Sequence, residues 1–315
     1  MNWVAPKTLK RAGILGMNRR NIEYIGQFNE RRHFPQVDNK LTTKILAVEA
    51  GLSVPKLIEV VETQHSIQVI GKRLQEIDDF VAKPAHGSGG KGILVIKERR
   101  GDSFIKASGE LIELADVQRH LTNTISGLHS LGGRPDVAFL EQRVQVADTF
   151  ASISFEGVPD IRLIVFKGFP VMGMLRLATK SSDGKANLHQ GAIGVGLNLA
   201  TGEAIQAVRH ERVITHHPDT GVPLQDIKIP GWSILLDLAA KCYEVSELGY
   251  LGCDIVLDKT HGAMILELNA RPGLSIQIAN NSGLLPRLNH LQAMDTRKMA
   301  IEERVQYAKQ TLAAI

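Results

Sequence analysis

A lysine and a run of glycines lie between two short apolar segments in DFVAKPAHGSGGKGI, residues 79–93. The glycines can adopt positive φ and let backbone N–H groups approach an anion closely, and Lys83 would face the same anion. Neither common phosphate loop matches, because Gly92 follows Lys91 where a P-loop requires Ser or Thr, and because a second strand follows instead of a helix. Two interpretations remain open, a phosphate-binding hairpin and a glycine-rich hairpin without a ligand.

Two carboxylates and an amide are expected to meet near the other end of the chain. Asp254 lies in GCDIVLD, and Glu267 and Asn269 lie in MILELNARPG, two predicted strands joined by the turn DKTHG. Residues two apart in a strand face the same side, and hairpin pairing can bring Asp254 beside them. Oxygen ligands of this kind suit Mg²⁺, which takes further ligands from nucleotide phosphates. The alternative is a salt bridge in which Arg271 neutralises the carboxylates.

The elements that position these residues follow from apolar periodicity. Short runs rich in β-branched residues predict strands at DFVAKP, GILVIKE, DVAFLEQRV, SISFEG, DIRLIVF, PVMGMLRLA, YLGCDIVLD and GAMILELN. Helical spacing predicts helices at 40–52, 114–131 and 232–249, the second ended by Gly132 and Gly133, with one more helix at about 21–30 and a helical stretch from about Arg287. Mostly antiparallel strands with interspersed helices predict an α+β protein, not a doubly wound sheet.

Composition places the chain among ordinary globular proteins with enough length for a sizeable core and two lobes: 315 residues, 43% hydrophobic and 22% charged. Cys242 and Cys253 have no paired metal spacing, which argues against a disulfide framework and a zinc site and favours a reducing compartment. The first residues lack a secretory apolar core, and no apolar run approaches the roughly 18 residues of a membrane span. We therefore expect a cytoplasmic protein with no membrane partner.

Basic residues gather near the start of the chain. Through Lys44 there are nine Lys or Arg against three acidic residues, a balance of +6, whereas the whole chain carries +4. Such a segment can bind nucleic acid, an acidic peptide or a phosphorylated ligand, and the alternative is a solvated or subunit-facing charged arm.

Six pieces in one order resemble the ATP-grasp superfamily, most closely its RimK-like glutamate ligase branch. They are Lys44, then Lys83 with the glycine loop, FLEQRV, DIRLIVFKGFPVMGMLR, ANLHQGA, and CDIVLD with LELNARPGL. The resemblance covers about residues 38–281 and implies two α+β lobes that sandwich ATP. We therefore divide the chain into a basic N-terminal segment, 1–38, an N-terminal lobe with the glycine-rich loop, 39–144, and a C-terminal lobe with the metal site and a C-terminal helix, 145–315.

The resemblance implies a set of nucleotide-binding residues. The two lysines would hold the α and β phosphates under the glycine loop, residues 141–144 would form the hinge that reads adenine, and Asp148 would take the ribose hydroxyls. The full set is Lys44, Lys83, His86, Gly87, Ser88, Gly89, Gly90, Gly92, Glu141, Gln142, Arg143, Val144 and Asp148.

The resemblance also implies a metal site and a reacting centre. Mg²⁺, or Mn²⁺ in its place, would bind Asp254, Glu267 and Asn269. Arg162 and Arg176, on adjacent predicted strands, would form a two-pronged clamp on the transferred phosphate, near Asp160. The polar segment 178–192 would be a mobile flap that carries Lys180, Asn187 and His189. Its ANLHQGA departs from the family's NLHRGG at Gln190 and Ala192. Arg271 and Ser275 would contact phosphate or substrate, or form only a turn.

The implied function is an ATP-dependent carboxylate–amine ligase that forms an amide through an acyl phosphate, joining glutamate or another amino acid to a peptide, protein or small molecule. The alternatives are an ATP-grasp phosphotransferase and a non-catalytic ATP-sensing adaptor that binds an acidic partner through its basic N-terminus. We do not expect a nucleic-acid partner, and a homo-oligomer is one candidate assembly.

ATP-grasp ligases usually carry a complete N-terminal α/β domain, whereas only about 38 residues precede the first ATP-grasp helix here. Two explanations stand. Either the basic segment supplies the missing wall of the substrate site through Arg19, Arg20, Arg31 and Arg32, or a partner subunit completes the site.

Overall fold

The computed structural model describes residues 5–315 except 88, 131, 152 and 296–298. These residues form two compact units. The small unit comprises Asp38–Ile45 and Val54–Gln145, and the large unit comprises Leu46–Ser53, Val146–Ile315 and the described residues up to Val37. Helix α5 (Lys40–Glu49) has residues in both units.

The small unit is built on a six-stranded antiparallel sheet in the order β1-β6-β2-β3-β4-β5. Its strands are β1 (Leu57–Val61), β2 (Phe80–Pro84), β3 (Leu94–Arg100), β4 (Ser103–Lys106), β5 (Leu111–Glu113) and β6 (Ala138–Glu141). Helices α6 (Gln64–Leu74) and α7 (Leu114–Ile125) place Ile70 and Leu121 in one core with Phe80. This core fixes β2 and β6, the two neighbouring strands that carry Lys83 and Glu141.

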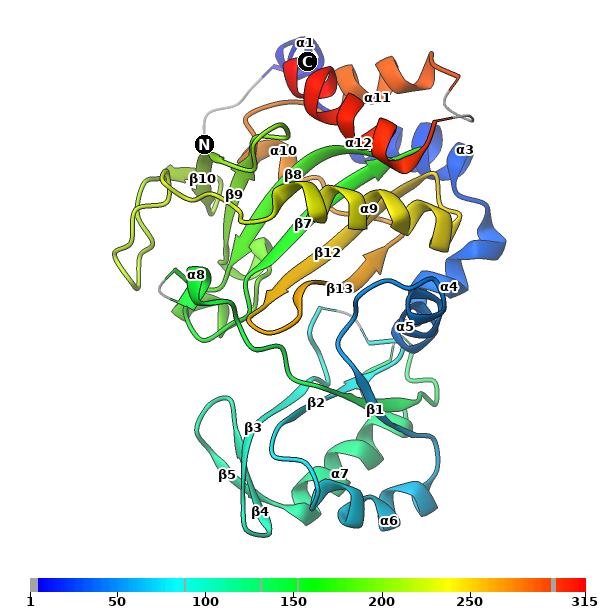
Figure 1. The fold of residues 1–315 in the computed structure, drawn as a ribbon, viewed down its shortest axis with the longest axis vertical. Coiled ribbons are helices and arrows are strands. Elements are labelled where there is room, and N and C mark those ends of the chain that lie inside the picture. The colour runs from blue at the N-terminus through cyan, green and yellow to red at the C-terminus, as the bar shows by residue number, and fades with distance from the viewer. Residues whose placement is uncertain (1–4, 88, 131, 152, 296–298) are drawn as a thin grey trace. The chain divides into compact units, whose positions relative to one another are not determined.

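The large unit is built on a seven-stranded antiparallel sheet in the order β11-β10-β9-β8-β7-β12-β13 (Figure 1). Its strands are β7 (Asp160–Phe166), β8 (Phe169–Leu177), β9 (Ile193–Leu197), β10 (Ala204–Arg209), β11 (Arg212–Ile214), β12 (Tyr250–Asp258) and β13 (Gly262–Asn269). All of β12 is buried, which explains its nearly continuous apolar sequence.

Helix α9 (Trp232–Ser246) lies across one face of this sheet (Figure 1). Cys253 Sγ donates to the Ala239 carbonyl oxygen of α9 at 3.8 Å, and a Cβ at Gly173 would lie 3.0 Å from the Trp232 ring. Because strand side chains alternate between faces, Asp254 and Arg176 point to the face opposite α9. Their carboxylate and guanidinium therefore belong to a face that the apolar helix does not occupy.

Shorter helices complete the chain. They are α1 (Pro6–Arg11), α2 (Met17–Arg19), η1 (Arg20–Ile25), α3 (Gly26–Phe28), η2 (Arg31–His33), α4 (Phe34–Asp38), α8 (Asp148–Ala151), η3 (Lys180–Ser182), η4 (Leu188–Gln190), α10 (Ile276–Ala279), α11 (Leu285–Gln292), α12 (Ile301–Gln310) and η5 (Leu312–Ala314). None of the helices in the described ranges has the length and apolar character needed to cross a membrane.

The N-terminal segment is part of the large unit. Leu15 N donates to Gln277 Oε1 at 2.8 Å, and Asn29 exchanges two hydrogen bonds with the backbone of Tyr250. Tyr24 is fully buried among aromatic rings that include Phe166. The described residues up to Val37 therefore belong to the same unit as the C-terminal residues, and Asp38 belongs to the small unit.

The α+β prediction is confirmed, because both sheets are antiparallel. The three long helices are confirmed but end earlier, at Glu49, Ile125 and Ser246. Helix α7 stops short because Gly127 takes a φ of +88° and its Cα lies so near the backbone that a Cβ would be 2.3 Å from the Arg134 oxygen.

Two further expectations differ from the structure. The strand expected at SISFEG is wrong, since residues 153–157 form turns and bends, and Ser152 lies outside the described residues. The helix expected at about 21–30 is a π-helical turn followed by α3, and it ends at Phe28. The helical stretch from about Arg287 is confirmed as α11 and α12.

Candidate active site

Four charged side chains meet on the face of the large sheet opposite α9, and we call Asp160, Arg162, Arg176 and Asp254 the arginine cluster. Strand register sets Asp254 beside Arg162 and Asp160 beside Arg176. Arg162 donates from Nε and Nη2 to the two oxygens of Asp254, at 2.7 and 2.6 Å. Arg176 donates from Nη2 to Asp254 Oδ2 at 2.8 Å and from Nε to Asp160. Asp254 is thus shared by two guanidinium groups, one of which binds it in two-point fashion.

Burial and neighbouring charges give the two carboxyl groups of the arginine cluster different pKa values. Asp254 is 2% exposed and Asp160 is 6% exposed. Burial raises the pKa of Asp160 to about 6, and the Asp254 charge adds to this effect while Arg176 opposes it. Burial also acts on Asp254, but the charges of Arg162 and Arg176 outweigh it and lower the pKa of Asp254 to about 2. Asp254 therefore stays ionised at neutral pH, and Asp160 is the member that takes up a proton as the pH falls.

Arg176 remains a cation. Burial alone would lower the pKa of its guanidinium, but the charges of Asp160 and Asp254 outweigh burial and raise it. With both aspartates ionised, the two positive and two negative charges of the arginine cluster cancel. Such a closed network holds its donors in fixed directions.

Glu267 and Asn269 lie on β13 next to Asp254. Register pairs Asp254 with Glu267 and Gly252 with Asn269, and Asn269 Nδ2 donates to Asp254 Oδ2 at 3.3 Å. Among the described residues, Asp254 Oδ1 accepts one hydrogen bond, from Arg162, which leaves it a lone pair. Two carboxylates and an amide are hard oxygen donors of the kind that Mg²⁺ uses. The described residues contain no group of three or more His, Cys, Asp or Glu side chains placed to hold a metal ion.

The expected flap, residues 178–192, is anchored at its base. Thr179 is fully buried, and its Oγ1 donates to the Gly191 carbonyl oxygen at 3.0 Å. Arg209 donates to the same oxygen at 3.1 Å and to Ser181 Oγ at 2.6 Å. The segment therefore folds around a fixed Thr179–Gly191 pair.

The chemically useful side chains of this flap have local partners or are exposed. Asn187 Oδ1 accepts from His189 N at 3.1 Å and so caps η4, while Lys180 N donates to Asp219 at 2.8 Å. The side chains of Lys180 and His189 are exposed. No hydrogen bond joins Lys180, Asn187 or His189 to the arginine cluster within the described part of the chain.

In the small unit, two lysines converge on one carboxylate, and we call Lys44, Lys83 and Glu141 the lysine cluster. Lys44 Nζ lies 2.9 Å from Glu141 Oε2, and Lys83 Nζ contacts Oε1. Burial lowers the pKa of Lys44, against the opposing charge of Glu141. Burial alone would raise the pKa of Glu141, but the charges of Lys83 and Lys44 reverse this and lower it. The cluster therefore carries one net positive charge in a largely buried setting, the condition under which an anion is attracted strongly.

The glycine loop is held at its start by Asp136 and at its end by His120, whose ring Nε2 lies 3.0 Å from the Gly92 oxygen. His86 N donates to Asp136 Oδ2 at 3.0 Å, and its ring Nδ1 lies 2.7 Å from Asp136 Oδ1. Gly89, Gly90 and Gly92 have positive φ. Gly87 does not, and glycine is needed there because a Cβ would lie 2.3 Å from the Pro84 ring. Ser88 lies outside the described residues.

The residues assigned to adenine and ribose have protein partners. Gln142 N donates to the Lys56 oxygen at 2.8 Å, Arg143 pairs with Asp79 at 2.8 Å, and Val144 is buried. Asp148 pairs with Lys259 at 2.9 Å on the surface. Since each of these polar groups is engaged, ligand contact at Arg143 or Asp148 would require exchange of a partner.

The basic N-terminal segment is partly neutralised. Arg19 pairs with Glu23 at 2.6 Å, and Arg32 pairs with Glu30 at 2.9 Å. Arg20 donates from Nη1 to the Pro272 oxygen at 2.8 Å, just beyond β13. The Arg271 guanidinium, suggested as a phosphate or substrate contact, stacks over the Phe34 ring with its carbon 4.8 Å from the ring centre.

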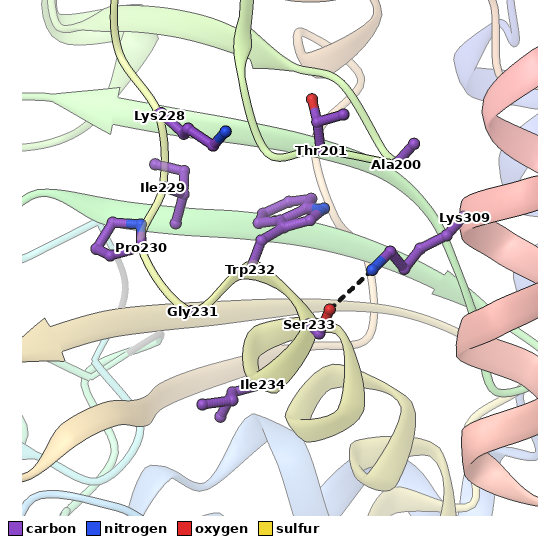
Figure 2. A pocket seen from close by; sticks show the side chains of 10 residues that line it. All are labelled: Ala200, Thr201, Lys228, Ile229, Pro230, Gly231, Trp232, Ser233, Ile234 and Lys309. Atoms are coloured by element: carbon purple, nitrogen blue, oxygen red, sulfur yellow. Dashed lines mark hydrogen bonds between the residues drawn. The ribbon is translucent and has the colours of Figure 1, made fainter.

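A cavity of about 460 Å³ lies beside the start of α9 and is not part of this site (Figure 2). Two hydrogen bonds fix side chains that line it. Lys309 Nζ donates to Ser233 Oγ at 2.8 Å, and Trp232 Nε1 donates to the Leu199 oxygen at 2.9 Å. Because Trp232 packs on the α9 side of the sheet at Gly173, this cavity faces away from the arginine cluster.

Sequence reasoning missed two residues. Asp136 orients His86, and Arg209 fixes the flap. The available signal for Asp136 was an acidic residue two positions before β6. No local pattern marked Arg209, whose partners are 18 and 28 residues away.

The fold is that of an ATP-grasp protein. Residues 19–293 match the family described as sugar-transfer associated ATP-grasp, and the chain belongs to this family. The superfamily resemblance and the ATP-grasp fold expected from the sequence are confirmed.

Solved structures give the following similarities. The ATP-grasp ligase PsnB complexed with minimal precursor is 16% identical, with 84% of this chain and 62% of that chain covered at a TM-score of 0.48. D-alanyl-alanine synthetase A from Vibrio cholerae is 9% identical, with 89% and 65% covered at a TM-score of 0.46. The L-amino acid ligase from Bacillus licheniformis is 12% identical, with 86% and 52% covered at a TM-score of 0.44. The chain thus spans less than two thirds of the length of these proteins, and no curated protein matches it significantly.

Proposed function

We propose that the protein is an ATP-dependent carboxylate–amine ligase. The observation that supports this most is the arginine cluster, in which two buried arginines share Asp254 beside the Glu267 and Asn269 donors. Membership of the ATP-grasp family supports ATP as the phosphoryl donor.

The lysine cluster would receive the nucleotide phosphates. Lys44 and Lys83 carry one positive charge in excess of Glu141. When a phosphate binds, each ammonium can turn on its flexible stem and exchange part of its Glu141 contact for a phosphate oxygen. The glycine loop, with His86 held by Asp136, would supply backbone N–H groups to the same anion.

Asp254 Oδ1, Glu267 and Asn269 would hold Mg²⁺. When bound, the ion supplies charge neutralisation for the phosphate oxygens during transfer. Asp254 would then have two tasks, since it also orients Arg162 and Arg176.

The first chemical step is phosphoryl transfer to the carboxylate substrate. A substrate carboxylate oxygen bonds to the γ phosphorus while the bond from that phosphorus to the β-γ bridging oxygen breaks and ADP leaves. Arg162 and Arg176 would face the charge that spreads over the moving group, and their fixed hydrogen bonds remove the need to reorganise at that moment.

The second step forms the amide. An amine nitrogen bonds to the acyl carbon, the bond from that carbon to the phosphorylated oxygen breaks, and inorganic phosphate leaves while the nitrogen loses a proton. The guanidinium groups would stabilise the oxyanion of the tetrahedral intermediate, the role that planar two-point donors serve well.

We further propose an amino acid as a substrate, with glutamate the first to test because of the RimK-like order of motifs. The N-terminal segment would border the carboxylate site, since Arg20 binds the Pro272 oxygen and Phe34 lies under Arg271, both next to β13. Arg31 is exposed there and is the basic residue of this segment best suited to meet an acidic acceptor.

The test is a screen of L-amino acids and acidic peptides for stimulated ADP release with Mg²⁺, followed by mass spectrometry of the products. A ligase adds one amino-acid residue to the acceptor and releases phosphate. Glu267→Gln should lower kcat by roughly 100-fold or more, because one metal ligand loses its charge. The matched control is Asp226→Asn, an exposed acidic residue of the same unit, which should keep wild-type turnover.

A product that gains only a phosphate would replace the ligase with a phosphotransferase. Undiminished Mg²⁺-dependent turnover in Glu267→Gln would overturn the assignment of the metal site.

A further inference from the structure

The last glycine of the glycine loop, Gly92, lies against the imidazole rings of two histidines. His120 belongs to α7, and His129 lies in the turn that follows this helix. The ring Nε2 of His120 lies 3.0 Å from the Gly92 carbonyl oxygen. The two rings are stacked, with their centres 5.6 Å apart and their planes at 28°. The end of the loop is therefore attached to a pair of side chains that the proposed reaction does not use.

The contact with His129 requires glycine in the loop. Gly92 has a φ of +74°, and a Cβ there would lie 2.5 Å from Cγ of the His129 ring and 2.7 Å from the His129 Cβ. Without a side chain, the backbone of Gly92 can lie directly against the ring, in a conformation that other residues rarely adopt. The His129 ring therefore supports the loop backbone from one side.

The core of the small unit holds His120 in place. Val117 and Leu121, on the same helix, are fully buried in that core. Thr124 Oγ1, one turn further along α7, donates to the His120 carbonyl oxygen at 2.9 Å. The His120 ring therefore projects from a helix that packing holds firmly.

The turn after α7 reaches the start of the loop as well. Ser130 forms an isolated antiparallel β-bridge with Gly87, and its Oγ donates to the Gly127 carbonyl oxygen at 3.0 Å. One turn therefore contacts the glycine loop at two places, through Ser130 at Gly87 and through His129 at Gly92.

His120 is the donor in its contact with Gly92. A carbonyl oxygen accepts hydrogen bonds, so Nε2 must carry the proton of the ring. Burial lowers the pKa of His120, the Gly92 hydrogen bond opposes this effect, and His129 and Lys106 of β4 add to it. His120 is therefore a neutral donor at neutral pH, and it fixes the direction of the Gly92 carbonyl without adding a charge.

The same hydrogen bond sets the direction of a backbone N–H group. In a trans peptide the carbonyl and the following N–H point in opposite directions, so the Ile93 N–H points away from His120. Among the described residues, this N–H has no hydrogen-bond partner. His120 therefore controls the direction of a donor that a ligand can use.

Lys83 lies on the side towards which this N–H points. Ala82 and Leu94 pack in one core with Val117 of α7, and strand side chains alternate, so Lys83 points to the face opposite α7. Ala82 also pairs with Leu94, which places Lys83 and Ile93 next to each other along the hairpin. An anion held by Lys83 is therefore on the same side as the Ile93 N–H.

We propose that His120 and His129 are positioning residues, which orient the peptide between Gly92 and Ile93 so that its N–H donates to a phosphate of the nucleotide. His120 fixes the direction of the peptide through its hydrogen bond, and His129 supports the peptide through its ring. The proposal rests on the proposed function, in which the lysine cluster receives the phosphates, and it deepens that function by adding two residues that control phosphate binding.

The test compares the affinity of wild type, His120→Leu and His120→Gln for a non-hydrolysable ATP analogue with Mg²⁺, measured by calorimetric titration of the full chain. Leucine removes the donor, whereas glutamine retains an N–H group at a similar distance from the backbone. We expect His120→Leu to raise the Kd about 5-fold, as the loss of one hydrogen bond does, and His120→Gln to stay within about 2-fold of wild type. The matched control is His65→Leu, an exposed histidine of the small unit, which should keep the wild-type Kd.

His129 provides an independent pair of variants. His129→Phe keeps a planar ring beside Gly92 and should bind the analogue as wild type does, whereas His129→Ala removes the ring and should raise the Kd by a similar factor of about 5. Circular dichroism shows whether each variant is folded. If His120→Leu is not folded, the His129 pair decides the outcome.

Two readouts separate positioning from a general loss of structure. Bound nucleotide should slow hydrogen exchange of the Ile93 amide, measured by NMR, in wild type and His120→Gln, and much less in His120→Leu. With an acceptor that stimulates ADP release, the KM of ATP should rise in His120→Leu while kcat stays within about 2-fold, because the contact serves the ground state and the transition state alike.

The outcomes distinguish this proposal from the ligase proposal. An unchanged Kd in folded His120→Leu and His129→Ala overturns the positioning role and leaves the ligase proposal standing. If no acceptor stimulates ADP release, the ligase proposal fails, and the expected changes in Kd still support the positioning role. The absence of nucleotide binding by wild type overturns both.

Discussion

Two buried charge clusters, one in each unit, combine cations and carboxylates in different ratios. In the small unit, two lysines share one carboxylate, that of Glu141. In the large unit, two arginines share two carboxylates, those of Asp160 and Asp254. The first cluster has a positive charge in excess, whereas the second is balanced.

The difference indicates different tasks. A lysine ammonium makes single-point contacts on a flexible stem and can lose its proton when it is buried, so its contacts can be exchanged for those of an incoming anion. An arginine guanidinium stays charged and binds in a fixed plane, so the arginine cluster is already arranged before any ligand arrives. We interpret the lysine cluster as the part that captures phosphate and the arginine cluster as the part that directs the reaction.

The largest expected effect is from Asp254→Ala. The change leaves Arg162 and Arg176 buried with only Asp160 to balance them, and removal of one partner from a buried ion pair costs about 3–5 kcal/mol. Urea unfolding followed by circular dichroism should show this loss in the free energy of unfolding. The exposed control Asp226→Ala should change it by less than about 0.5 kcal/mol. A loss below about 1 kcal/mol in Asp254→Ala would mean that the arginines reorganise freely, contrary to a preorganised cluster.

Glu141→Gln should lower the free energy of unfolding by a smaller amount than Asp254→Ala, about 2 kcal/mol at pH 7. A buried lysine can lose its proton and become neutral, whereas an arginine cannot. Burial already lowers the pKa of Lys44, and loss of the Glu141 charge removes the influence that opposes burial. A lysine whose pKa is lower in the folded state gains stability as the pH rises, so the loss should shrink between pH 7 and pH 9.

The same urea titrations at the two pH values check this prediction, with Glu62→Gln, an exposed glutamate of the small unit, as the control. Asp254→Ala should show no such recovery. Equal pH dependence in both variants would remove the distinction between the clusters.

The smallest effect concerns Asp160, whose pKa is raised to about 6 from an unfolded value near 4. A carboxyl with a raised folded pKa contributes stability that is present below pH 4 and lost as the pH rises through 6. The wild-type free energy of unfolding should therefore contain a decrease on the order of 2 kcal/mol between pH 4 and pH 6.

Asp160→Asn removes the titrating group and should remove this decrease, whereas Asp226→Asn should retain it. Unfolding titrations at half-unit steps of pH provide the measurement. Identical slopes in wild type and Asp160→Asn would show that another group takes up the proton.

Much of the fold could be predicted from the sequence because its signals are local. The alternation of DIRLIVF and PVMGMLRLA placed Arg162 and Arg176 on strands that proved to be neighbours, and the short DKTHG turn set Asp254 beside Glu267. Hairpin register depends on a few residues around a turn, so a single sequence contains it.

The partners of each charge could not be predicted in this way. Glu141 was assigned to adenine, yet it lies between Lys44 and Lys83, because β6 enters the sheet between β1 and β2 after a long excursion of the chain. The contact between His120 and Gly92 likewise joins residues 28 positions apart.

The sequence by itself therefore determined the strands that carry the two clusters, the face on which each charged residue lies and the ATP-grasp order of motifs, whereas β1, β4, β5, β9, β10 and β11 were not predicted. Only the tertiary structure decided which carboxylate neutralises which cation, that Asp160 and Asp254 have opposite pKa shifts, and that the basic N-terminal segment packs beside β13. The physical reason is the sequence separation over which each interaction acts. Side-chain alternation is set by neighbours along the chain, whereas burial and charge pairing depend on strand order across the sheet, which no local pattern encodes.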